Sequence, residues 1–229
     1  MTAAAIYLFD IDGTLLRAGG AGTRALNQIF AARYGVSDAM AGIDCGGRTD
    51  PWIVREVFTR QLGRAATADE VDAVLDAYVP ALERELAAST AFRVLPFVAV
   101  TLDGLAARGG VEVGLATGNI EAGARVKLSR AGLAGRFGFG GFGCDSADRA
   151  ELVARAIERG VARAGACPPE RVVVVGDTVH DVTAARACGV RVVAVATGNV
   201  DRARLEAAAP DVVLDDLSGL DAWHAAALA

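Results

Sequence analysis

The chain has 229 residues, of which 53% are hydrophobic and 22% charged, and its formal net charge is -5 at pH 7. This length allows one large domain or a domain with an insertion. Because the chain is mildly acidic and its basic residues are scattered, we expect neither nucleic acid nor an anionic membrane as a partner. No apolar run reaches the roughly 20 residues of a membrane span, and the N-terminus lacks the basic stretch of a secretory signal. We therefore expect a cytoplasmic protein.

The cysteines and histidines limit the kinds of site that the chain can build. The four cysteines are far apart and form no CxxC pair, so they fit neither a zinc site nor a disulfide framework. His180 and His224 are the only histidines. Two histidines argue against a histidine-based triad and against a multi-histidine metal site.

Residues 6–15 read Ile-Tyr-Leu-Phe-Asp-Ile-Asp-Gly-Thr-Leu. An apolar run that stops at a turn signal predicts a buried strand of a parallel sheet. Ligands of open α/β sheets lie beyond the carboxyl ends of the strands, where Asp10 and Asp12 fall. Two carboxylates there repel each other unless a shared proton or a cation, such as a hard divalent ion, is present. The alternative is a strand followed by a simple Asp-Gly turn.

The pattern then becomes helical up to about residue 93, with no strand signal. Pro51 suits the first turn of a helix that Thr49 or Asp50 would cap. Thr67 and Glu70 have the spacing of a capping box at the start of another helix. Apolar spacing predicts helices over residues 23–34, 51–62 and 68–88.

From residue 94 onwards short apolar runs alternate with helical segments. This alternation predicts a doubly wound, Rossmann-like parallel sheet with right-handed crossovers. We expect an α/β core domain of residues 1–16 and 94–229 and a small all-helical cap domain of residues 17–93, inserted over the site. Strands are expected over residues 111–116, 137–142, 172–175, 192–196 and 212–214.

Other strand ends would add polar groups to the same crevice. The predicted strand 111–116 leads into Thr117, Gly118 and Asn119. The four-valine run at residues 172–175 leads to Asp177, and Asp181 follows one helical turn later. A single acid at a helix start is often only a cap. Pairs of acids at two strand ends instead indicate an oxygen-rich pocket suited to Mg²⁺.

The order of these motifs resembles that of the haloacid dehalogenase-like (HAD) phosphohydrolases, over essentially the whole chain. The resemblance implies that Asp10 is the nucleophile, which forms an aspartyl-phosphate, and that Asp12 is the general acid and base. It implies that Asp10, Asp177 and the backbone carbonyl of Asp12 hold Mg²⁺, with Asp181 supporting the metal shell. The Thr117 hydroxyl and nearby backbone N–H groups would bind phosphate. The place of the helical insertion is similar to that of the subgroup with a C1 cap, which includes phosphoglycolate phosphatases and β-phosphoglucomutases.

The phosphate-binding cation departs from the common pattern of this family. Many relatives carry Lys-Pro in the third motif, whereas this chain has one lysine, Lys127. It lies about two turns into the helix after Thr117, a long reach for which a solvated helix face is the better alternative. Arg149 stands where the family's lysine usually falls, and we favour it as a forked, permanently charged substitute.

Two further segments can each be interpreted in two ways. Residues 46–50, Gly-Gly-Arg-Thr-Asp, resemble the substrate-facing cap loop of the family. Arg48 could bind a substrate carboxylate or second phosphate there, or it could be a solvated arginine in a helix-capping loop. The sequence Ala-Thr-Gly-Asn occurs at 116–119 and again at 196–199. Only the first copy has the family order, so the second is expected to be a strand-to-helix turn, with contact to the site rim left open.

The function expected from this resemblance is a Mg²⁺-dependent phosphatase acting on a small phosphorylated metabolite, phosphoglycolate-like, as a monomer or homodimer. A sugar phosphomutase and a catalytically silent binding protein of the same fold are the alternatives. Dehalogenation is disfavoured because it does not need Asp12 or the pair Asp177 and Asp181. Phosphonate cleavage through a Schiff base needs a lysine in the cap, and residues 17–93 contain none.

Overall fold

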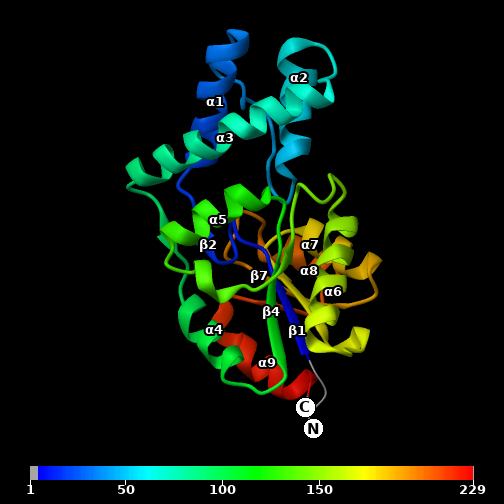
Figure 1. Cartoon of the computed structure of the whole chain (residues 1–229). Coiled ribbons are helices and arrows are strands. Elements are labelled where there is room, and N and C mark those ends of the chain that lie inside the picture. The colour runs from blue at the N-terminus through cyan, green and yellow to red at the C-terminus, as the bar shows by residue number, and fades with distance from the viewer. Residues whose placement is uncertain (1–4, 229) are drawn as a thin grey trace.

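The apolar run before Asp10 forms β1 (Ala5–Phe9), an inner strand of a six-stranded sheet (Figure 1). The computed structural model describes residues 5–228. All paired strands of this sheet run parallel, in the order β5-β4-β1-β6-β7-β8, which confirms the predicted doubly wound α/β fold. The other strands are β4 (Val111–Ala116), β5 (Gly140–Gly141), β6 (Val172–Gly176), β7 (Arg191–Val195) and β8 (Val212–Leu214).

Side-chain alternation along β1 builds two apolar layers. Tyr7 and Phe9 belong to the core on one face of the sheet, and Ile6 and Leu8 to the core on the other; all four are fully buried. A strand buried on both faces reads as a continuous apolar run, which is why the sequence signal is strong. The first face is covered by α4 (Val98–Ala106), α5 (Glu121–Arg130) and α9 (Leu220–Ala227), and the second by α6 (Arg149–Ala164), α7 (Val179–Ala187) and α8 (Arg202–Ala207). Short 3₁₀ turns lie at residues 134–136, 169–171 and 217–219.

A helical insert follows β1 and lies over the carboxyl ends of the strands, at the top of Figure 1. It enters and leaves through an antiparallel pair, β2 (Leu16–Arg17) and β3 (Arg93–Val94). Its helices are α1 (Ala21–Tyr34), α2 (Asp50–Leu62) and α3 (Ala68–Ala88), which share an apolar core of their own. Thr49 caps α2, and Thr67 with Glu70 forms the predicted capping box of α3. The division of the chain into two domains at residues 16/17 and 93/94 stays a prediction.

Two expectations about strands were wrong in detail. Residues 17–93 were expected to contain no strand, but Arg17 and Arg93 pair across β2 and β3. Two-residue strands are too short to show a period of two. The strand expected over 137–142 is only Gly140–Gly141. A Cβ on Gly141 would lie 1.9 Å from the backbone oxygen of Leu152, so α6 packs directly on the strand's backbone.

Among the described residues, no helix combines the length and the apolar character that crossing a membrane requires.

The last helix is attached to β1 by a buried polar contact whose strength should depend on pH. The Tyr7 hydroxyl and His224 Nδ1 lie 2.6 Å apart. Burial, assisted by the charge of Arg108, lowers the pKa of His224 below its ordinary 6.5. Below about pH 6.5, His224 therefore becomes protonated in the unfolded chain but stays neutral in the folded chain. The free energy of unfolding consequently falls as the pH falls towards the lowered pKa.

We expect the substitution His224→Gln to remove this part of the pH dependence. Between about pH 7.5 and about pH 5.5 the wild type should lose stability more steeply than the variant, by up to about 1.4 kcal/mol per pH unit below 6.5. Urea unfolding at each pH measures the difference. Parallel stability curves for the two proteins would contradict it.

Candidate active site

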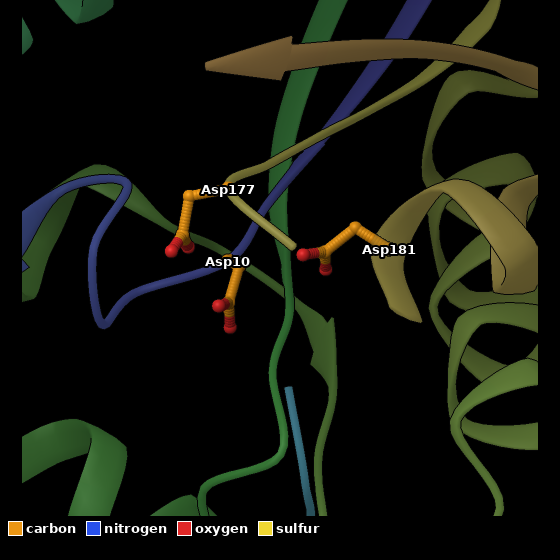
Figure 2. Close-up of side chains that lie close together, drawn as sticks. All are labelled: Asp10, Asp177 and Asp181. Atoms are coloured by element: carbon orange, nitrogen blue, oxygen red, sulfur yellow. The ribbon is translucent and has the colours of Figure 1, made fainter. Parts of the chain in front are cut away.

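Three acidic side chains from distant parts of the sequence meet at the carboxyl edge of the sheet (Figure 2). Asp10 follows β1, Asp177 follows β6, and Asp181 lies in the first turn of α7. Each offers a carboxylate oxygen within 4.8 Å of the other two, and all three residues are buried. The adjacent parallel strands end together, with Phe9 in register with Val175, so the acids that follow them must be neighbours.

The cluster holds more negative than positive charge. Burial raises the pKa of Asp10, against the opposing effect of Arg149. Burial also raises the pKa of Asp177, and the charges of Asp10 and Asp181 raise it further. The ion pairs described for this cluster join two of its three acids, Asp10 and Asp181, to a single cation, Arg149. A divalent cation would relieve the remaining repulsion, and the all-oxygen donor set is the one that Mg²⁺ prefers.

Arg149 occupies a central place between the acids. Its side chain is only 9% exposed, and its Nη2 lies 3.2 Å from an oxygen of Asp10 and 2.6 Å from one of Asp181. Nη1 donates a hydrogen bond of 3.2 Å to the backbone oxygen of Gly47 in the insert. The second oxygen of Asp181 accepts from the backbone N–H and the hydroxyl of Thr178, at 3.0 and 2.7 Å. Asp181 therefore holds Arg149 beside Asp10, and both of its oxygens already have partners.

Asp12 belongs to a second cluster. Its Oδ2 accepts hydrogen bonds from Asn119 Nδ2 at 2.8 Å and from Lys127 Nζ at 2.5 Å. Lys127 also donates to Asn119 Oδ1 at 2.5 Å, and Asn119 Nδ2 donates to the Thr117 hydroxyl at 2.8 Å. The Asp12 side chain remains 41% exposed. One oxygen is thus fixed by the protein while part of the carboxylate stays accessible.

The interpretation of Lys127 as part of a solvated helix face was wrong, because the residue is only 5% exposed. Burial alone would lower its pKa, but the charges of Asp12 and Asp50 outweigh this effect and raise the pKa above its ordinary value. The rise of the helix puts the Lys127 backbone about two turns from the start of α5. Helical side chains lean towards the N-terminus, which brings the end of a long side chain back to the start of α5.

A loop of the insert is hydrogen-bonded to the turn after β4. The backbone N–H of Asp50 donates to the oxygen of Gly118 at 2.8 Å, and Asp50 Oδ2 accepts from the backbone N–H of Ile120 at 2.8 Å. A Cβ on Gly118 would lie 2.1 Å from the backbone oxygen of Arg48, so the two backbones are in close contact. Burial, opposed by Lys127, raises the pKa of Asp50 to about 6. The sequence placed Asp50 at a helix cap and in the segment that resembles a substrate-facing cap loop, but gave no sign of this contact with the β4 turn.

A cavity of about 720 Å³ lies between the insert and the sheet. Arg48 lies on its wall, exposed, with its guanidinium 4.4 Å from the centre of a Trp52 ring. Thr117 and Asp181 are buried and are not among the lining residues. The other residues singled out from the sequence all line it: Asp10, Asp12, Arg48, Gly118, Asn119, Lys127, Arg149 and Asp177.

Known proteins resemble this chain in sequence and in fold. The chain is 28% identical, over 219 residues, to a phosphoglycolate phosphatase of Agrobacterium fabrum, and the match covers 94% of this chain and 90% of that protein. Its fold resembles that of a hydrolase from Pseudomonas syringae, with a TM-score of 0.72, 20% identity, and 99% and 100% of the two chains covered. A predicted phosphoglycolate phosphatase from Haemophilus somnus gives a TM-score of 0.70 at 21% identity, with 97% and 99% covered.

The sequence pattern of one family matches most of the chain, from residue 5 to residue 189. This stretch contains the cluster of three acids, the second cluster around Asp12, the insert and Arg149. The protein belongs to the haloacid dehalogenase-like hydrolases.

Proposed function

We propose that this hydrolase is a Mg²⁺-dependent phosphatase that acts on a small phosphorylated metabolite through an aspartyl-phosphate intermediate. The observation that carries the proposal is the convergence of Asp10, Asp177 and Asp181, with Arg149 beside them, at a cavity large enough for a small metabolite. The similarity to a phosphoglycolate phosphatase makes a phosphoglycolate-like compound the first substrate to test.

Asp10 is the nucleophile in this proposal. A carboxylate oxygen attacks phosphorus, the bond to the leaving oxygen breaks, and water later hydrolyses the aspartyl-phosphate. Arg149, fixed by Asp181 within 3.2 Å of Asp10, is placed to bind the oxygens of a phosphoryl group on that residue. A bound Mg²⁺ ion, held by Asp10, Asp177 and the backbone carbonyl of Asp12, would supply charge neutralisation for the transferring group.

Asp12 transfers the protons. Its carboxyl group gives a proton to the leaving oxygen and later takes one from the attacking water. Lys127 and Asn119 hold Oδ2, so they set the direction in which the accessible part of the carboxylate points. The loop with Gly47 and Asp50 contacts both the acidic cluster and the turn after β4, and this contact would help to exclude bulk water during the reaction.

The substitution Asp10→Asn should abolish hydrolysis while keeping the shape of the side chain. Loss of the nucleophile should lower kcat for p-nitrophenyl phosphate by at least about a thousandfold. Wild-type activity should disappear with a chelator and return when Mg²⁺ is added. Circular dichroism of the variant checks that it is folded. Activity that is independent of Mg²⁺, or unchanged in the variant, would contradict the proposal.

The two buried cations, Lys127 and Arg149, should have different effects on kcat and KM. Lys127→Met removes the group that orients Asp12, so kcat should fall by about a hundredfold with little change in KM. Arg149→Met removes a phosphate-binding fork and should also raise KM. Arg125→Met is the matched control, because Arg125 is exposed on the same helix and pairs with Glu121. Steady-state kinetics with p-nitrophenyl phosphate gives both constants, and a wild-type kcat for Lys127→Met would refute its role.

A further inference from the structure

The second Ala-Thr-Gly-Asn segment, at residues 196–199, follows β7, the strand next to β6 in the sheet. Asp177 follows β6, so the two strand ends are neighbours at the carboxyl edge. Gly198 and Asn199 line the same cavity as Asp177. The contacts of this segment with the acidic cluster go beyond those of a simple turn.

Gly198 packs directly against Asp177. A Cβ built on Gly198 would lie 1.7 Å from Asp177 Oδ2, a distance at which one of the two groups must move. The φ angle of Gly198 lies outside the left-handed region, so an alanine there would clash with the carboxylate without straining its own backbone. Gly13, in the turn after Asp12, contacts the same oxygen, because a Cβ on it would lie 2.3 Å away. The Asp177 carboxylate is therefore held between two glycines, while Thr14 donates to Oδ1 at 3.1 Å.

Thr197 connects the segment to the turn that follows β1. Its hydroxyl donates a hydrogen bond of 2.6 Å to the backbone oxygen of Gly13. Gly13 directly follows Asp12, whose backbone carbonyl is a proposed magnesium ligand. One side chain thus fixes the spacing between the β1 turn and the end of β7, with Asp177 between them.

Arg17 anchors the segment from outside. Its guanidinium donates to the backbone oxygens of Thr197 and Gly198, at 2.5 and 2.8 Å, and to Asn199 Oδ1 at 3.0 Å. Arg17 lies in β2, the strand through which the chain enters the helical insert. The guanidinium fork suits two carbonyl oxygens because its donors are planar and rigid.

We propose that Thr197 and Gly198 are positioning residues of the magnesium site, which set the place of Asp177 relative to the β1 turn, with Arg17 as their anchor. The proposal rests on the proposed function, because it assumes that these acids bind Mg²⁺. Neither residue touches the reacting atoms. Gly198 acts through the Asp177 carboxylate, and Thr197 acts through the turn that carries the Asp12 carbonyl.

The test measures Mg²⁺ binding directly, by calorimetric titration of the full chain with MgCl₂ and no substrate. Gly198→Ala places a methyl group against Asp177 Oδ2, and the resulting shift changes the position of the carboxylate relative to the β1 turn, so the Kd for Mg²⁺ should rise by about 10- to 100-fold. Gly109→Ala is the matched control, because Gly109 also lies in a loop, has an ordinary φ, and its added Cβ would meet no atom within 4 Å. The control should bind Mg²⁺ as the wild type does.

A second pair of variants tests the hydroxyl and does not depend on the folding of Gly198→Ala. Thr197→Val keeps the shape but removes the donor to Gly13 and should weaken Mg²⁺ binding by about tenfold, whereas Thr197→Ser keeps the donor and should restore it. A Kd equal to the wild-type value in both Gly198→Ala and Thr197→Val overturns this inference alone. A wild type that binds no Mg²⁺ overturns the magnesium site and, with it, the proposed function.

Discussion

Mutual repulsion among three buried carboxylates is the constraint on which the rest of this structure depends. Asp10, Asp177 and Asp181 lie within 4.8 Å of one another, and burial raises the pKa of the first two. Arg149 offsets part of the repulsion through ion pairs with Asp10 and Asp181. Such an arrangement costs stability and is maintained only because the sheet forces the strand ends together. Binding of a divalent cation would relieve the remaining repulsion, which is why we connect this site to phosphoryl transfer.

The two acids after β1 have different partners, although only one residue separates them. Asp10 is buried beside Arg149, whereas Asp12 is partly exposed and is held by Lys127 and Asn119. Different surroundings allow two carboxyl groups of one site to do different work, one as nucleophile and one in proton transfer. In the proposed mechanism each acid therefore has its own cation, and neither cation can substitute for the other.

The helical insert completes the site through its backbone more than through its side chains. The oxygen of Gly47 accepts from Arg149, and the N–H of Asp50 donates to Gly118. A close contact with the backbone of Arg48 leaves no room for a side chain at Gly118, so glycine there is required by a neighbour from the insert. Because Arg17 joins the entry strand of the insert to the segment beside Asp177, the insert and the metal site are mechanically connected.

The sequence by itself determined the parallel sheet, the helical insert, and the acids at strand ends, because strand and helix periodicities and caps such as Thr67 are local. The resemblance to a known family pointed to Arg149, which lies beside Asp10 in the structure. Only the tertiary structure decided that Lys127 is buried on Asp12, that Asp50 joins the insert to the β4 turn, and that Gly198 packs against Asp177. These contacts join residues far outside one another's sequence neighbourhood, and their geometry depends on helix packing and side-chain direction. No pattern of neighbouring residues encodes that geometry.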